Sequence, residues 1–170
     1  YAHEVIPSLS SHFLVWDADT FLLTPPRFFL PDSCVARFGT HHQYHPDYFR
    51  HMAQLHPWLQ RQTNQSGICN FMAFQAGFVR EMMAMVEARH GGTPFWQVFL
   101  DHVDPQAMSG ASEFEMYFNF MLRFHPNAVQ LMDPPLRFEN YTSQVPSEQD
   151  FLHPQHDLVS VHWYLRHKHL

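Results

Sequence analysis

Residues 13–23 read FLVWDADTFLL, two apolar runs separated by the acidic triplet Asp17-Ala18-Asp19. A short continuous apolar run is typical of a strand buried on both faces of a mainly parallel sheet, so we expect such a strand at residues 13–16. Side chains two positions apart on a strand point the same way, so Asp17 and Asp19 are expected to face one target. In open α/β sheets, ligands bind beyond the carboxyl ends of the strands, which is where this pair falls.

The acidic pair predicts a metal site. Two carboxylates at the end of a buried strand repel each other unless a cation or strong hydrogen-bond donors lie between them. Oxygen ligands of this kind favour Mn²⁺ or Mg²⁺. His162, near the end of a strand expected at residues 158–165, is a candidate third ligand. The alternatives are a loop in which Asp17 and Asp19 cap turns or backbone amides, and a purely structural His162.

Composition limits the class of protein. The chain has 170 residues, of which 45% are hydrophobic and 16% aromatic, and this is enough for one folded domain over residues 1–170. Its formal net charge is -6, with 10 Lys and Arg residues and no basic stripe, which argues against a nucleic-acid partner. No apolar run approaches the roughly 18 residues of a transmembrane helix, and no secretory signal opens the sequence. With Cys34 and Cys69 far apart, these features predict a cytoplasmic location, with peripheral membrane attachment left open.

A second motif, SGASEFEMY at residues 109–117, marks a helix start. Ser112 and Glu115 have the spacing of a capping box, in which the Ser112 hydroxyl accepts from the Glu115 N–H and the Glu115 carboxylate reaches back. Glu113 lies in the first turn, where the helix dipole favours a carboxylate, and it is also a candidate general base for a hydroxyl. His41, His42, Tyr44 and His45 form a further polar cluster that either lines a substrate site or lies on the surface.

Hydrophobic periodicity and turn residues predict the remaining elements. We expect helices at residues 46–59, 76–90, 94–103 and 112–124. We expect short strands at residues 34–38, 67–74, 128–132 and 136–138, and a loop at residues 140–155.

The order of these motifs resembles that of GT-A nucleotide-sugar glycosyltransferases. The pattern is a strand ending in DAD, the strand SGICNFMAF, the acidic helix start SGASEFEMYFNFML and the final strand VSVHWY. The chain looks closest to a little-characterised bacterial and viral family of glycosyltransferase-like proteins with LDADT-like and SGASEYE-like signatures. The resemblance covers nearly the whole chain. It implies a three-layer α/β/α fold with a mixed, mainly parallel central sheet.

The resemblance also implies roles for particular residues. Asp17 and Asp19 match the donor-binding and metal-binding aspartates, and His162 matches the C-terminal metal-binding histidine. Gly67 matches a donor-binding glycine, and Glu113 matches the catalytic base, with Glu115 as the alternative. The implied reaction is Mn²⁺- or Mg²⁺-dependent transfer, of the hexosyltransferase type, from a nucleotide-sugar donor to an acceptor hydroxyl in glycan or polysaccharide synthesis.

One departure from the family pattern affects this expectation, and two other readings stay open. Only 16 residues precede Asp17, so the N-terminal strand–helix units that hold the nucleotide base in such enzymes are expected to be missing from this sequence. Haloacid-dehalogenase-like phosphatases also carry an aspartate pair after a strand, but here Phe21 stands where they have Thr or Val, and the single Lys, Lys168, is at the tail. The third reading is a sugar- or metal-binding fragment without catalysis.

Overall fold

The computed structural model describes residues 1–31, 33–140 and 145–162. In chain order its helices are α1 (Ala2–Val5), α2 (Pro46–Leu55), α3 (Ala76–Arg89), α4 (Phe95–Asp101), α5 (Glu113–Phe124), the 3-10 helix η1 (Pro126–Ala128) and α6 (Glu148–Leu152). The strands are β1 (His12–Trp16), β2 (Thr20–Leu22), β3 (Ala36–Phe38), β4 (Phe71–Gln75), β5 (Val129–Leu131), β6 (Phe138–Asn140) and β7 (Leu158–Ser160). The chain is therefore a mixed α/β protein, as expected.

The strands form three small sheets within the described residues, where the sequence predicted one central sheet. β1 pairs with β4 antiparallel, and β3 pairs with β5 parallel. In the third sheet β7 lies between β2, which is antiparallel to it, and β6, which is parallel. Two pairings are parallel and two antiparallel, so the prediction of one mainly parallel sheet was wrong. An apolar run shows that a strand is buried, but it does not show the direction of the partner.

The surroundings of β1 also differ from the prediction. The strand at residues 13–16 is confirmed, but it is not buried on both faces, because the side chain of Leu14 is 38% exposed. Its other face packs inward, where Phe13 stacks on Phe74 at 5.5 Å between ring centroids. The face that carries Leu14 is partly covered, because Trp16 on that face stacks on Phe71 at 5.6 Å between ring centroids.

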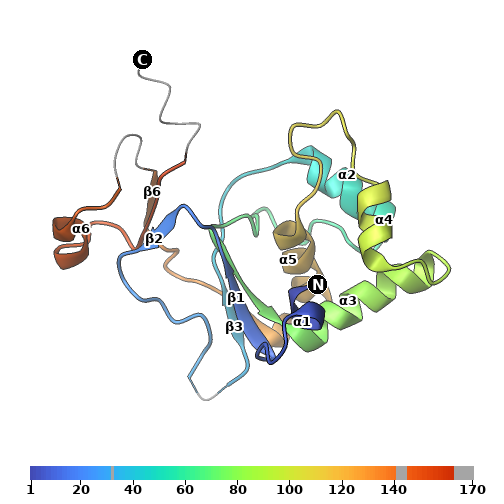
Figure 1. Ribbon diagram of the computed structural model, residues 1–170, viewed down its shortest axis with the longest axis horizontal. Helices are drawn as coiled ribbons and strands as arrows, with labels where there is room; N and C mark the ends of the chain where they lie inside the picture. The colour runs from blue at the N-terminus through green and yellow to red at the C-terminus, as the bar shows by residue number, and fades with distance from the viewer. Residues whose placement is uncertain (32, 141–144, 163–170) are drawn as a thin grey trace.

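Helix α5 is the centre of the core. All eight residues from Phe114 to Met121 are buried. Helix α3 contacts α4, α5 and β4, and α2 contacts α5. Figure 1 shows α2, α3, α4 and α5 gathered at one end of the molecule, with β2, β6 and α6 at the other end and β1 and β3 between them. The loop that follows β1 thus lies where the helical part meets the small sheet of β2, β7 and β6.

Local sequence accounts for several element boundaries. Helix α2 ends at Leu55, earlier than predicted, because His56 precedes Pro57 and is extended, as residues before proline favour. Helix α6 lies inside the predicted loop at residues 140–155. Its signal was present, since Ser147 and Asp150 form a capping box. The predicted strand at residues 158–165 is β7 over Leu158–Ser160, and residues 163–165 lie outside the described part of the chain.

The small sheet is anchored at its start by the Asp157 carboxylate. It accepts from the Arg137 guanidinium at 2.9 and 3.2 Å and from the Thr24 hydroxyl at 2.7 Å. The bonds from Arg137 are the main reason why the pKa of Asp157 lies far below its usual range. These contacts hold the segments leading into β6 and β7 beside the end of β2, and β7 in turn leads to His162.

Gly67 has a packing role that a substitution can test. A methyl group at this position would lie 2.4 Å from Phe118 Cβ on α5, so Gly67→Ala must displace the loop or the helix. We expect a loss of about 1–3 kcal/mol in the free energy of unfolding, as for other overpacked sites. The matched control is Gly77→Ala in α3, where no heavy atom lies within 4 Å of the added methyl group. That change is expected to stabilise the protein by about 0.4–1 kcal/mol, and equal effects of the two in urea titrations would contradict this interpretation.

Candidate functional site

The loop Asp17-Ala18-Asp19 joins β1 to β2 and is held by backbone hydrogen bonds from three directions. The Asp17 N–H donates to Asn70 O at 2.9 Å, and the Thr20 N–H donates to Asp17 O at 3.0 Å. The Val161 N–H donates to Asp19 O at 2.9 Å. The loop is therefore fixed between the start of β4 and the end of β7, and the two carboxylates are left to make other contacts.

His162 reaches this loop from the far end of the chain. Its Nδ1 lies 2.9 Å from Asp19 Oδ2, and the two side chains are 17% and 39% exposed. His162 thus lies beside Asp19, although 143 residues separate the two in the sequence. Within the described residues, no backbone amide donates to either carboxylate, and no hydrogen bond reaches that of Asp17. The alternative in which backbone amides cap both aspartates does not describe this loop.

The environment of Asp17 disfavours its negative charge. Partial burial raises the pKa of its carboxyl, and the nearby charges of Asp19 and Glu113 raise it further, while His162 acts in the opposite direction. Burial is the larger cause of this shift, and the neighbouring acids add to it.

This pKa shift predicts how stability depends on Asp17. A carboxyl whose pKa is higher in the folded state stabilises the fold when it is protonated at low pH, and that contribution is lost as pH rises through the folded pKa. Asp17→Asn is therefore expected to raise the thermal midpoint of the metal-free protein at pH 7, by an amount equivalent to less than about 1 kcal/mol because solvent screens the charge. The gain should shrink at pH 4. Thermal unfolding at both pH values checks this, and a lower midpoint at pH 7 would contradict it.

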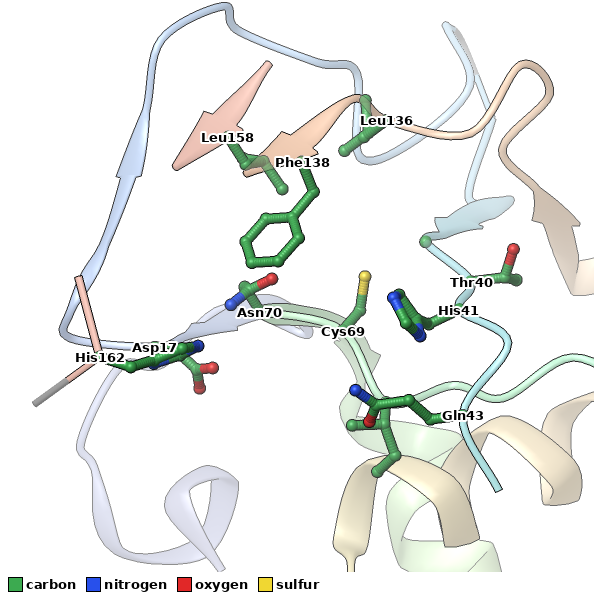
Figure 2. Close-up of a pocket in the computed structure, with 12 residues that line it drawn as sticks. Asp17, Thr40, His41, Gln43, Cys69, Asn70, Leu136, Phe138, Leu158 and His162 are labelled. Atoms are coloured by element: carbon green, nitrogen blue, oxygen red, sulfur yellow. The ribbon is translucent and has the colours of Figure 1, made fainter. Parts of the chain in front are cut away.

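Asp17 and His162 line a pocket of about 270 Å³. Its other lining residues are Gly39, Thr40, His41, Gln43, Ile68, Cys69, Asn70, Leu136, Phe138 and Leu158. Figure 2 shows Asp17 and His162 at one end, Thr40, His41 and Gln43 at the other, and Phe138 above Asn70 and Cys69. None of these lining residues within the described chain is Lys or Arg. An anionic ligand would thus meet no permanently charged cationic side chain here.

The cluster of His41, His42, Tyr44 and His45, for which the sequence allowed either a substrate site or the surface, contributes one residue to the pocket. His41 lines the pocket, whereas His42 and Tyr44 are exposed. The position of His41 is fixed by a pair of backbone hydrogen bonds with Ser66, at 3.0 and 2.8 Å. Cys69 also lines the pocket, and burial raises the pKa of its thiol to about 11, so it remains a protonated thiol near pH 7.

Glu115 is linked to the pocket wall through Ser66, which pairs with His41. Its side chain is 1% exposed, its Oε1 accepts from Asn119 Nδ2 at 2.8 Å, and the Ser66 hydroxyl donates to its Oε2. The Ser112 side of the predicted capping box is observed, with the Glu115 N–H donating to Ser112 Oγ at 3.2 Å. The predicted reverse contact is not, because the Glu115 carboxylate bonds to Ser66 and Asn119 instead. Glu115 thus anchors the segment that pairs with His41, and its burial keeps it away from a substrate.

The other predicted residues lie outside the pocket. Gly67 is buried against Phe118, and the residues that follow it, from Ile68 to Asn70, form the wall. Glu113 is the exposed first residue of α5 and borders a separate apolar hollow with Phe13 and Val15. Phe13, Val15 and Asp17 alternate along the β1 direction and so share a face, which is consistent with the effect of Glu113 on the pKa of Asp17.

Sequence reasoning missed a buried polar cluster that joins the three strands of the site. Asn70 Nδ2 donates to Thr20 Oγ1 at 3.1 Å and to Ser160 Oγ at 2.9 Å, and the two hydroxyl oxygens are 2.5 Å apart. The available signal was a polar residue, Asn70, inside the apolar run GICNFMAF. This cluster ties the start of β4 to β2 and β7, and so fixes the segments that carry Asp17, Asp19 and His162.

The donor atoms suit a hard divalent ion, but the arrangement is not a preformed cage. Two carboxylates and an imidazole are ligands that Mn²⁺ accepts. Within the described residues, however, no three His, Cys, Asp or Glu side chains are grouped so that they could hold a metal ion. Mg²⁺ and similar ions are commonly held by one or two carboxylates together with substrate phosphates and water, and this looser arrangement is the one that fits.

Comparison with known proteins does not identify a family. No protein-family model matches the chain, and no curated protein gives a significant match. None of the helices in the described residues combines the length and apolar character needed to cross a membrane. The features that bear on function are the pocket lined by Asp17 and His162 and the contact of Asp19 with His162.

Proposed function

We propose that this chain is a metal-dependent glycosyltransferase that uses a nucleotide-sugar donor. The observation that carries the proposal is that Asp17 and His162, from opposite ends of the chain, line one end of a pocket, and that Asp19 contacts His162. Asp17 and Asp19, with His162, are the residues that would hold Mn²⁺ or Mg²⁺. The bound ion would supply positive charge against the diphosphate leaving group.

The charge of the pocket supports a metal-dependent donor. A diphosphate placed beside Asp17 would be repelled by its carboxylate, and the described pocket wall offers no Lys or Arg to compensate. A divalent cation held by Asp17 and Asp19 would reduce the repulsion between these carboxylates and the phosphate. Asp19 Oδ2 and His162 Nδ1 lie 2.9 Å apart, close enough to serve as neighbouring ligands of one ion.

Glu113 is the proposed base for the acceptor hydroxyl. It lies in the first turn of α5, where the helix dipole favours its ionised form, and it is exposed. Its charge acts on Asp17, although it lies outside the pocket that Asp17 lines. An acceptor that enters from the side of β1 that carries Phe13 and Val15 would place its hydroxyl between Glu113 and the donor. The proton would pass to the Glu113 carboxylate as the hydroxyl oxygen attacks the anomeric carbon.

The proposal is tested by calorimetric titration with UDP-glucose, UDP-N-acetylglucosamine and GDP-mannose, each with and without Mn²⁺. We expect at least one donor to bind with Mn²⁺ and none to bind measurably in EDTA. Metal-independent binding of equal strength would contradict the role of the ion. If none of the three donors binds, the transferase proposal fails.

Glu113→Gln separates binding from chemistry. The amide keeps the shape of the side chain but does not accept a proton, so we expect unchanged donor affinity and a loss of roughly 10²- to 10⁴-fold in transfer rate. Chromatographic detection of released nucleoside diphosphate, with an acceptor present, measures the rate. Wild-type turnover in this variant would move the base to another residue.

A sugar- or metal-binding role without catalysis is the second candidate. One observation favours it: neither Glu113 nor Glu115 lines the pocket that contains Asp17 and His162. Metal-dependent donor binding without any release of nucleoside diphosphate, in the presence of a range of sugar acceptors, would support this candidate over the transferase.

A further inference from the structure

The amide of Asn70 is held in one orientation by its hydrogen bonds. Asn70 Nδ2, Thr20 Oγ1 and Ser160 Oγ make three mutual contacts of 2.5, 2.9 and 3.1 Å. When the amide atom facing the two hydroxyls is Nδ2, its two hydrogens and one hydroxyl hydrogen satisfy all three contacts. If Oδ1 faced the two hydroxyls instead, only two hydroxyl hydrogens would be available for the three contacts. In the third contact two oxygen atoms would then face each other with no hydrogen between them. The carbonyl oxygen Oδ1 must therefore be the atom directed away from the cluster.

Asn70 also lies directly across from Asp17. The bond from the Asp17 N–H to Asn70 O continues the β1–β4 ladder one step beyond the pair of Trp16 and Phe71. Side chains at opposed positions of an antiparallel pair lie on the same face, about 5 Å apart at Cβ. A ligand group held at Asp17 would thus have its neighbouring atoms within reach of Asn70. No donor among the described residues reaches Oδ1.

The pocket wall near Asn70 is apolar. Phe138, Leu136 and Leu158 line this part of the pocket, and Figure 2 shows the Phe138 ring on the same side as the Asn70 amide. A neutral, fixed acceptor beside an aromatic ring suits a sugar ring, which offers a hydroxyl donor at its edge and C–H groups on its face. An uncharged acceptor also avoids the repulsion that a carboxylate would exert on an adjacent phosphate.

We propose that Asn70 Oδ1 accepts a hydrogen bond from a hydroxyl of a sugar ring that packs against Phe138. This inference rests on the proposed function, because that proposal identifies the sugar as part of a nucleotide-sugar. The hydroxyl belongs either to the transferred sugar or to the ribose, because both rings are attached to the diphosphate that Asp17 would face. Asn70 is then a residue that decides specificity, in addition to its role in joining the strands.

The test compares two variants that each remove hydrogen bonds from the cluster of Asn70, Thr20 and Ser160 but differ in whether Asn70 Oδ1 is kept. Asn70→Ala removes the acceptor, whereas Ser160→Ala removes one partner of Nδ2 and leaves the Thr20 contact to hold the amide. With Mn²⁺ and the donors named above, Asn70→Ala is expected to weaken binding about 5- to 10-fold, the value of one net hydrogen bond. Ser160→Ala is expected to stay within about 2-fold of wild type. If the transferred sugar supplies the hydroxyl, the nucleoside diphosphate alone binds wild type and Asn70→Ala equally. If ribose supplies it, the nucleoside diphosphate binds Asn70→Ala more weakly than wild type, and the 2′- or 3′-deoxy analogue that lacks the bonded hydroxyl binds the two proteins equally.

A measurement on the ¹⁵N-labelled wild-type protein keeps this inference separate from the proposed function. The Asn70 side-chain amide signals are followed by NMR during titration with methyl glucoside, methyl mannoside and the nucleotide-sugars. Nucleotide-sugar binding with unchanged affinity in Asn70→Ala overturns the inference and leaves the transferase proposal in place. Shifts of the Asn70 signals by the methyl glycosides, without nucleotide-sugar binding, support the inference and reject the transferase. If no ligand moves these signals, the inference is wrong.

Discussion

Asp19→Ala is expected to abolish metal-dependent transfer and hydrolysis of the nucleotide-sugar, with a loss of at least about 10²-fold, while the protein stays folded. The substitution removes one of two carboxylates proposed to hold the ion, and it also removes the oxygen that lies 2.9 Å from His162 Nδ1. Loss of a residue that only orients a ligand typically costs about 10- to 100-fold in metal affinity or activity, and loss of a ligand itself is expected to cost at least as much. Release of nucleoside diphosphate, measured at several Mn²⁺ concentrations, gives the size of the effect.

The matched control for this variant is Asp101→Ala. Asp101 is an exposed aspartate at the end of α4 and borders a different hollow, so its removal changes the net charge equally without touching the site. Both variants are expected to keep the wild-type far-ultraviolet circular dichroism spectrum. Wild-type activity in Asp19→Ala at every Mn²⁺ concentration would reject the metal assignment.

Glu115→Ala is expected to have the largest effect on stability, a loss of about 2–4 kcal/mol in the free energy of unfolding. The change leaves the Ser66 hydroxyl and the Asn119 amide without their acceptor in a site that is almost fully buried. Each buried donor left unpaired costs about 1–3 kcal/mol, and the vacated volume adds to this. Because Ser66 pairs with His41, the wall of the pocket should loosen as well. Urea denaturation and hydrogen exchange at residues 41 and 66 measure the two effects.

Glu113→Ala is the control two residues away on the same helix. Glu113 is exposed, so its replacement should change the free energy of unfolding by no more than about 0.5 kcal/mol, as is usual for surface positions. Comparable destabilisation by the two variants would show that the hydrogen bonds of Glu115 contribute little. The pair also separates the roles of the two acids, since Glu113 is proposed to act on substrate and Glu115 supports the fold.

Many of the elements were predictable because their signals are local. The positions of α2, α3, α4 and α5 follow from apolar periodicity, and the Ser112 cap marks the start of α5. Helix α6 carried an equally clear signal at Ser147 and Asp150 that was not used. The sheet arrangement was not predictable in the same way. The pairing of β1 with β4 depends on which segment reaches it and in which direction, and Phe13–Trp16 has the same apolar character in either case.

The residues of the candidate site also differ in whether a local pattern in the sequence predicts them. Asp17 and Asp19 could be singled out because two acids after an apolar run conflict with burial, and this conflict is visible in the sequence. His162 was a candidate third ligand from its place near the end of a predicted strand and from the resemblance, and the structure brings it to Asp19. The sequence favoured Glu113 as the base and kept Glu115 as the alternative, and burial now separates them. Asn70 and Phe138 were missed, because a single polar or aromatic residue in a strand has no local pattern that predicts the cavity it faces.

The amino-acid sequence by itself determined the helices, the acidic loop and the cap of α5, since each depends on residues within a few positions of one another. Only the tertiary structure decided that β1 runs antiparallel to β4, that His162 lies 2.9 Å from Asp19 across 143 residues, and that Asn70 holds three strands together. The physical reason is that burial and long-range hydrogen bonds depend on how the whole chain packs around α5. A carboxylate such as Glu115 therefore becomes a structural anchor or a candidate for chemistry according to which face of that helix it occupies.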